Sequence, residues 1–170
     1  MNELGKGAND ALETILKKFE LYYNVTTEGI EPPFAAEAAF KSHSEQYFLV
    51  KAAKVADIDS NEFVFFYFND EISNQKQDDI AKIADTAWER GLSRITPYYG
   101  HRNTDITLIV LSEKIGEDAF KKIKKLNHYK SYKFGLYGWS SFRTLAYESS
   151  TGRLATNWRG RGLKKLIGSI

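Results

Sequence analysis

The chain has 170 residues, of which 42% are hydrophobic, 27% are charged and 14% are aromatic, and it contains no cysteine. This length and composition are typical of a globular domain with a sizeable core, so we expect one domain over residues 1–170. The absence of cysteine excludes disulfides, thiolate zinc sites, iron–sulfur clusters and a cysteine nucleophile.

The hydropathy pattern gives no sign of a leader or a membrane span. The N-terminal stretch lacks a positive segment followed by an apolar one, as a secretory signal would need. The longest purely apolar run is Phe63–Phe68, far below the ~20 residues that cross a bilayer. We therefore expect a cytoplasmic protein without a membrane partner.

The net charge of +2 hides a strong asymmetry between the two parts of the chain. Residues 1–115 carry 12 Lys and Arg against 19 Asp and Glu, a net charge of −7. Residues 116–170 carry 12 Lys and Arg against 3 Asp and Glu, a net charge of +9. Such a basic segment indicates an acidic partner, within or outside the chain.

The first half of the chain predicts one helix and three strands. A helix over about residues 10–23 is indicated by apolar residues at helical spacing: Leu12, Ile15, Leu16, Phe19 and Tyr23. Pro32 and Pro33 end this region. Residues 34–42 and 46–54 follow as a hairpin, and residues 62–68 predict a strand that is covered on both faces.

The second half predicts a helix over about 74–90, with Gly91 as its stop, then a buried strand over 105–113 and a helix over 116–127. Three strands over 131–137, 141–149 and 153–157 and a short helix over 162–170 complete the chain. In 131–137, alternation predicts Tyr132, Phe134 and Leu136 on one face.

These elements predict an α+β fold with a single mixed, largely antiparallel sheet and helices packed on it. The expected order is α-β-β-β-α-β-α-β-β-β-α.

The basic third of the chain combines cations with Tyr and Trp residues, a pattern suited to binding phosphates and bases. The expected anion-binding residues are Arg143, Arg153, Arg159, Arg161, Lys164 and Lys165. Trp139 and Trp158 are the expected stacking platforms. The densest part, residues 157–165 ("NWRGRGLKK"), lacks the spacing of a P-loop, and an exposed linker to a terminal helix is the simpler interpretation of it.

The loop "TPYYGHRNTDI" over residues 96–106 is the other candidate site, because it lies directly before a buried strand. His101 can act there as a general base oriented by Asp105, or the two can share a metal. Plain surface positions are the alternative. No other catalytic, cofactor or metal motif is present, so we expect no cofactor and no dedicated metal site.

The expected early order of a helix, three strands, a helix and a strand resembles the core of restriction-endonuclease-like nucleases. That resemblance implies a DNA-facing surface and a site made of an Asp on the second core strand and a Glu-x-Lys on the third. Residues 46–54 contain no acid, and Val64 stands where the Lys should follow Glu62. The resemblance therefore implies topology and no activity.

The runs "KSYKFGLYGWSSFR" and "TNWRGRGLKKL" resemble small uncharacterised prokaryotic proteins, a domain family with no assigned function. That resemblance covers most of the chain and implies no catalytic residue.

Three hypotheses follow from the sequence. The first is a non-enzymatic binding domain whose basic C-terminal surface engages an anionic partner such as nucleic acid. The second is a hydrolase or nuclease-like enzyme that uses the His101 loop. The third is a homo-oligomer in which the acidic part of one subunit meets the basic part of another, which salt would dissociate.

Overall fold

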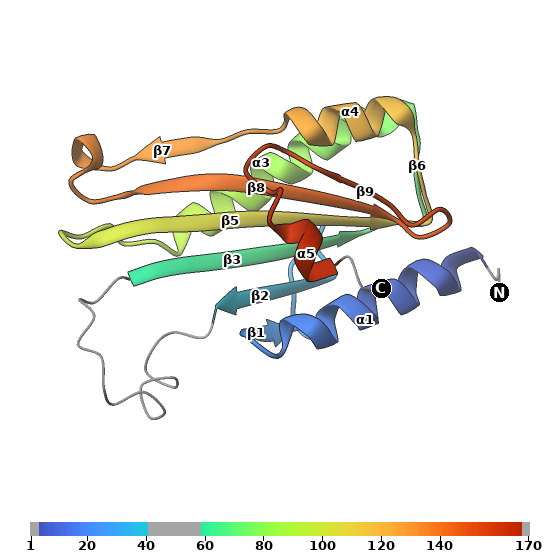
Figure 1. Cartoon of the computed structure of the whole chain (residues 1–170), viewed down its shortest axis with the longest axis horizontal. Helices are drawn as coiled ribbons and strands as arrows, with labels where there is room; N and C mark the ends of the chain where they lie inside the picture. The colour runs from blue at the N-terminus through green and yellow to red at the C-terminus, as the bar shows by residue number, and fades with distance from the viewer. Residues whose placement is uncertain (1–3, 41–58, 168–170) are drawn as a thin grey trace.

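A computed structural model describes residues 4–40 and 59–167 of the chain. At its centre lies a seven-stranded sheet with the strand order β1-β2-β3-β5-β8-β7, in which β9 also pairs with β8 (Figure 1). The strands of this sheet are β1 (Tyr23–Thr26), β2 (Ala36–Phe40), β3 (Asp59–Phe68), β5 (His101–Ser112), β7 (Tyr129–Ser131), β8 (Trp139–Glu148) and β9 (Arg153–Thr156).

The three central strands β3, β5 and β8 are parallel neighbours, linked by α3 (Gln77–Ser93) and α4 (Glu117–Lys125). The other four pairings of this sheet, β1 with β2, β2 with β3, β7 with β8 and β8 with β9, are antiparallel. The α+β class and the mixed, mostly antiparallel sheet are therefore confirmed. The parallel centre needs long connections, and the two helices supply them.

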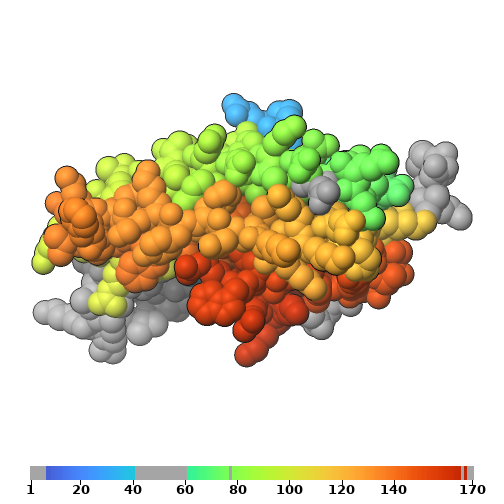
Figure 2. Space-filling view, turned by 90° about the horizontal axis from the view of Figure 1, so that it is seen from above, coloured from blue at the N-terminus to red at the C-terminus, as the bar shows by residue number. Residues whose placement is uncertain are grey.

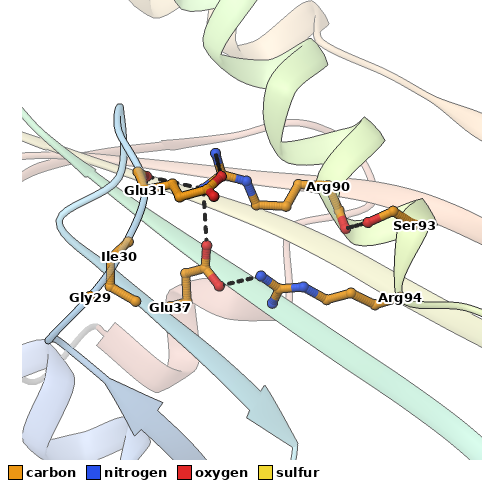
Figure 3. A pocket seen from close by; sticks show the side chains of 7 residues that line it. All are labelled: Gly29, Ile30, Glu31, Glu37, Arg90, Ser93 and Arg94. Atoms are coloured by element: carbon orange, nitrogen blue, oxygen red, sulfur yellow. Dashed lines mark hydrogen bonds and ion pairs between the residues drawn. The ribbon is translucent and has the colours of Figure 1, made fainter.

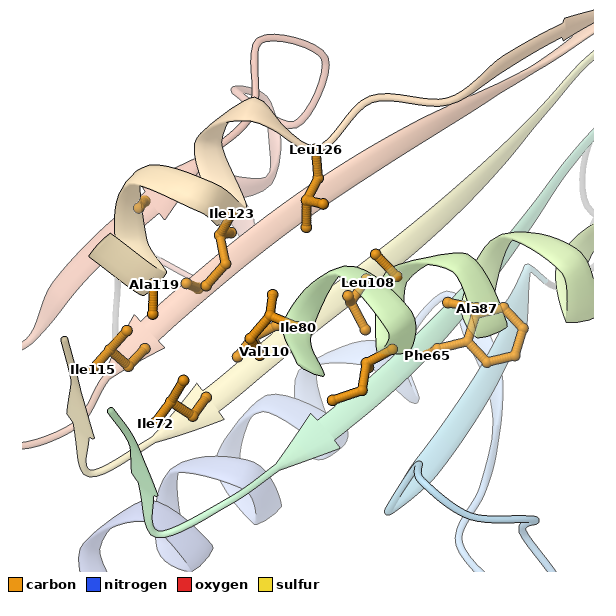
Figure 4. Packing of buried hydrophobic residues seen from close by; sticks show 14 of the residues in the cluster. Phe65, Ile72, Ile80, Ala87, Leu108, Val110, Ile115, Ala119, Ile123 and Leu126 are labelled. Atoms are coloured by element: carbon orange, nitrogen blue, oxygen red, sulfur yellow. The ribbon is translucent and has the colours of Figure 1, made fainter. Parts of the chain in front are cut away.

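Helices cover both faces of the sheet. The helices α1 (Leu4–Phe19) and α5 (Leu163–Ile167) pack on one face, against Phe66, Ile109 and Leu145. The helices α3 and α4 pack on the other face, and Figure 4 shows Leu108 and Val110 of β5 beneath them. Because β3 and β5 are covered on both sides, their unbroken apolar runs are explained as the sequence predicts.

A second, two-stranded parallel sheet lies beyond the carboxyl end of the central strands. It pairs β4 (Glu71–Ile72) with β6 (Lys114–Ile115), and the turn η1 (Asn74–Lys76) follows β4. The side-chain oxygen of Asn74 accepts a hydrogen bond of 2.9 Å from the backbone N–H of Asp118, in the first turn of α4. This contact satisfies one of the N–H groups that a helix leaves free at its start.

Gly91 lies inside α3, which continues to Ser93, so its prediction as a helix stop is wrong. A Cβ atom at position 91 would lie 2.6 Å from Cδ1 of Ile106, a fully buried residue of β5. The glycine therefore serves the close approach of α3 to the sheet and does not end the helix.

One strand was not predicted, and one predicted strand is not tested by the structure. The strand β1 follows α1 directly and was expected to be part of the first helix, because Tyr23 continues its apolar stripe. The residues 46–54, expected as a strand, lie outside the described ranges.

The predicted strand over 131–137 is wrong beyond Ser131. Lys133, Phe134 and Gly135 form the turn η2, and all three have a positive φ, of 49°, 55° and 89°. Phe134 and Leu136 are consequently exposed, whereas alternation placed them with Tyr132 on one face. An alternating pattern in a short segment does not distinguish a strand from a turn.

Candidate anion-binding site

A basic cleft lies where the end of α4 meets the turn that follows β9. Its volume is about 270 Å³, and it is lined by Lys124, Lys125, Leu126, Asn127, Asn157, Trp158 and Arg159. In Figure 2 the orange band from the end of α4 into β7 runs beside the red segment that follows β9. Two segments about 30 residues apart in sequence thus form one basic surface, which we call the Trp158–Arg159 cleft.

Asn157 holds this cleft together. Its buried side-chain oxygen accepts hydrogen bonds from the backbone N–H groups of Thr144 (3.1 Å) and Gly160 (2.8 Å). Its Nδ2 donates to the carbonyl oxygens of Leu126 (2.9 Å) and Phe142 (3.0 Å). One side chain therefore joins the end of α4, the strand β8 and the 157–160 turn. Asn157 is not among the predicted site residues, although asparagine is a typical turn former.

The guanidinium of Arg159 lies over two aromatic rings, 5.3 Å from the ring centroid of Tyr129 and 5.6 Å from that of Trp158. Both rings are more than half exposed. Among the described residues, Arg159 makes no ion pair with an Asp or Glu. Because an arginine stacked on a ring keeps its N–H edge free, this group is available to an anion.

Two of the other predicted anion-binding residues already have carboxylate partners in the chain. Arg153 forms a two-pronged ion pair with Glu117 and lies 4.0 Å over the ring of Phe120. The hydrogen bond from Arg153 lowers the pKa of Glu117, and the same hydrogen bond raises the pKa of Arg153. This pair ties β9 to the start of α4.

Arg143 belongs to a polar network on the other face of the sheet. Its guanidinium pairs with Glu62 and, at 3.6 Å, with Asp105, and its Nε donates to Thr107 at 3.2 Å. Tyr23 donates a hydrogen bond of 2.7 Å to the second oxygen of Glu62. The network thus joins β1, β3, β5 and β8, and its one arginine is shared by two carboxylates.

The remaining predicted residues lie elsewhere. Arg161, Lys164 and Lys165 are exposed in and before α5, whose apolar residues pack on the α1 face of the sheet. Trp139 is 40% exposed and lines a separate hollow of about 530 Å³ together with Tyr99, Arg102 and Leu136. The structure therefore brings Trp158 and Arg159 together with the α4 lysines, and leaves Trp139 in a different place.

His101 and Asp105 use their polar atoms on different partners. The ring nitrogens of His101, which is 3% exposed, lie 2.9 Å from the carbonyl oxygen of Tyr137 and 2.9 Å from the hydroxyl of Thr104. Asp105 accepts a hydrogen bond of 2.6 Å from Ser141 and pairs with Arg143. These contacts join β5 to the turn before β8 and to β8 itself, and neither residue orients the other.

A third hollow, of about 310 Å³, lies between α3 and the loop before β2 (Figure 3). Glu37 accepts hydrogen bonds from Arg90 (3.1 Å) and Arg94 (2.5 Å), and Arg90 also binds the backbone oxygens of Glu31 and Pro32. Two arginines and two glutamates line this hollow, so its charges balance. Arg90 lies in the last turn of α3, and Arg94 follows directly after the helix.

Within residues 4–40 and 59–167, no three side chains of His, Asp or Glu come close enough to hold a metal ion together. In the same ranges, no helix is both long and apolar enough to span a bilayer.

A family model for a domain of unknown function (DUF8052) matches residues 8–168. The chain belongs to this family. The resemblance to a domain family without an assigned function is thereby confirmed, whereas the restriction-endonuclease-like resemblance finds no support. No curated protein and no solved structure is significantly similar to the chain. The Trp158–Arg159 cleft lies within the matched DUF8052 region.

Proposed function

We propose that this domain is a non-enzymatic binding module that holds a polyanion, specifically nucleic acid, in the Trp158–Arg159 cleft. Lys124, Lys125 and Arg159 would contact phosphates, and the exposed rings of Trp158 and Tyr129 would stack on bases. Because a single strand offers its bases for stacking and a duplex does not, the single strand should bind more tightly.

The observation that carries this proposal is the state of Arg159. Its guanidinium is held over two exposed rings, 5.3 and 5.6 Å from their centroids, and has no ion pair among the described residues. Arg143 and Arg153, by contrast, are paired with Glu62, Asp105 and Glu117. A cation that is preorganised and unpaired is the kind of group that an anionic ligand completes.

The rigidity of the 157–160 turn also favours binding. Asn157 fixes the turn through four hydrogen bonds, so Trp158 and Arg159 lose little freedom when a ligand arrives. The contacts of His101 give the hydrolase hypothesis no comparable support, because both ring nitrogens already have partners. The pairing of Arg143 and Arg153 within the chain leaves fewer cations for the acidic surface of a second subunit.

The test is fluorescence anisotropy with a labelled mixed-sequence single strand and its duplex, measured at increasing salt concentration. Affinity should fall steeply with salt. Each phosphate contact on a single strand contributes about −0.7 to the slope of the logarithm of the binding constant against the logarithm of the salt concentration. Arg159→Glu should weaken binding at least about tenfold. It should also reduce the size of that slope by about 0.7, the contribution of one phosphate contact.

The matched control is Lys17→Glu, the same charge reversal on an exposed residue of α1, on the opposite face of the sheet. It should leave the anisotropy titration unchanged. Equal weakening by both variants would mean that net charge alone attracts the strand, and the cleft would lose its role. No binding by the unmodified protein at low salt would reject the proposal outright.

A further inference from the structure

The turn between β7 and β8 and the loop before β5 form a protruding apolar end of the molecule, at the left of Figure 1. The side chains of Tyr99, Phe134 and Leu136 are 79%, 105% and 66% exposed, and those of Tyr98 and Trp139 are 43% and 40% exposed. We call these five residues the aromatic tip. Five large apolar side chains gathered at one end are unusual on the surface of a soluble domain and mark an interaction site.

The backbone of the tip is strained in a way that keeps Phe134 in solvent. Lys133 and Phe134 both have a positive φ, a conformation that costs free energy for residues with a Cβ. Phe134 makes no packing contact in return, since its side chain is fully exposed. Because the Phe134 ring itself offsets none of this strain, its exposure indicates a partner outside the chain.

The turn is also held firmly from below. The backbone N–H groups of Tyr132 and Tyr137 bond to the carbonyl oxygens of Gly138 (2.9 Å) and Tyr132 (3.2 Å). His101 lies 2.9 Å from the carbonyl oxygen of Tyr137, which ties the turn to the start of β5. Gly138 is required here, because a Cβ atom would lie 2.2 Å from the carbonyl oxygen of Arg102. The tip is thus a rigid projection.

Positive charge lies beside the tip, and the two chain segments that form it contain no Asp or Glu. Arg102, Lys130 and Lys133 are exposed beside its apolar side chains. No Asp or Glu occurs between Asp118 and Glu148, nor from Ile95 to Asn103. In the described ranges these three cations form no ion pair. A partner that fits the tip is therefore apolar inside and anionic at its surface.

We propose that the aromatic tip docks on an anionic lipid bilayer. Phe134 and Leu136 would enter the acyl region, Tyr99 and Trp139 would lie at the level of the headgroups, and the three cations would face anionic headgroups. Leu136 favours a bilayer over a nucleic acid, because an aliphatic side chain offers no surface for stacking. Such peripheral docking needs no spanning helix. It is independent of the proposed function, which uses the Trp158–Arg159 cleft.

The test is sedimentation of the full chain with two kinds of vesicle, phosphatidylcholine alone and phosphatidylcholine mixed with phosphatidylserine. The protein should sediment with the mixed vesicles, much less with phosphatidylcholine alone, and less at high salt. Phe134→Ser/Leu136→Ser should weaken binding at least about tenfold, because the transfer of each apolar side chain from water into the bilayer lowers the free energy of the complex. Both residues are exposed, so thermal unfolding should not change.

The matched control is Leu21→Ser/Tyr22→Ser, which removes two exposed apolar side chains, 71% and 52% exposed, at the end of α1. It should sediment as the unmodified protein does. Absence of sedimentation with the mixed vesicles overturns the proposal, and so does equal sedimentation of the tip variant and the unmodified protein.

The two proposals fail separately. Arg159→Glu should lose the nucleic acid and keep the vesicles, whereas the tip variant should do the reverse. A tip variant that loses the single strand but keeps the vesicles would assign the tip to the nucleic-acid surface and overturn membrane docking.

Discussion

Asn157 and Thr144 exchange two hydrogen bonds across the pair β8–β9. The N–H of Thr144 donates to the Asn157 side-chain oxygen at 3.1 Å, and the N–H of Asn157 donates to the Thr144 hydroxyl oxygen at 3.2 Å. The Thr144 hydroxyl in turn donates to the carbonyl oxygen of Ile123 in α4 at 3.0 Å. This buried connection positions the cleft, and its loss should be measurable as a loss of stability.

Asn157→Ala should lower the free energy of unfolding by about 2–4 kcal/mol, because it leaves two N–H groups and two carbonyl oxygens without their buried partner. Urea unfolding measures the change. Asn127→Ala, an exposed asparagine that lines the same cleft, should change it by less than about 0.5 kcal/mol. If Asn157→Ala lowered the free energy of unfolding as little as Asn127→Ala does, water would be replacing the hydrogen bonds of Asn157.

Gly91→Ala should destabilise the protein by about 1–3 kcal/mol, because the new Cβ atom meets the buried side chain of Ile106 at 2.6 Å. Gly7→Ala, the same change in α1 with open space around it, should stabilise by about 0.5–1 kcal/mol through helix propensity. Thermal or urea unfolding compares the two. The cost of Gly91→Ala should shrink in an Ile106→Ala background, which removes all three side-chain atoms that the new Cβ meets, and an unchanged cost would place the clash elsewhere.

The polar network should make stability fall at alkaline pH. Burial, together with the neighbouring carboxylate of Glu62, raises the pKa of Tyr23 above its usual value. Above pH of about 10, an unfolded tyrosine loses its proton while the folded one keeps it, so the free energy of unfolding decreases, by up to about 1.4 kcal/mol per pH unit. The stabilisation is complete below the unfolded pKa and disappears as the pH rises through the folded one.

Tyr23→Phe isolates this effect. It should cost about 1 kcal/mol near neutral pH, where the 2.7 Å hydrogen bond to Glu62 is lost. Urea unfolding of both proteins across the alkaline range should show their stabilities converging. Parallel curves would mean that Tyr23 contributes nothing to the alkaline loss.

Phe134→Asn should keep or raise the free energy of unfolding, by up to about 1 kcal/mol, because asparagine adopts a positive φ more readily and the phenyl ring makes no contact. Leu136→Asn is the control, since Leu136 is also exposed but has an ordinary φ of −64°. It should bring no gain. A destabilised Phe134→Asn would show that the ring does pack in solution, which contradicts the strained tip.

Much of the architecture could be predicted from local patterns. The apolar stripe Leu12, Ile15, Leu16 and Phe19 correctly predicts α1, and the unbroken run of β5 correctly predicts a strand covered on both faces. These patterns work because the period of burial follows from the geometry of the element itself. The alternation at 131–137 failed, because a turn pinned by His101 and Gly138 overrides it.

The candidate site could be predicted only in part. Arg143 and Arg159 look alike in the sequence, as cations in an acid-poor segment. Their difference depends on residues far along the chain, since Glu62 lies 81 positions before Arg143. Asn157 gave no signal beyond that of a turn residue.

The sequence by itself determined the α+β class, the order of most elements and the basic character of the C-terminal third, since composition and periodicity are local properties. Only the tertiary structure decided which cations are neutralised and which remain available. Pairing of β3, β5 and β8 brings Glu62 and Asp105 to Arg143, whereas packing of the 157–160 turn against α4 leaves Arg159 over two exposed rings. The sequence gives the number of charges, whereas the energy of each charge pair depends on the distance that folding sets between the two groups.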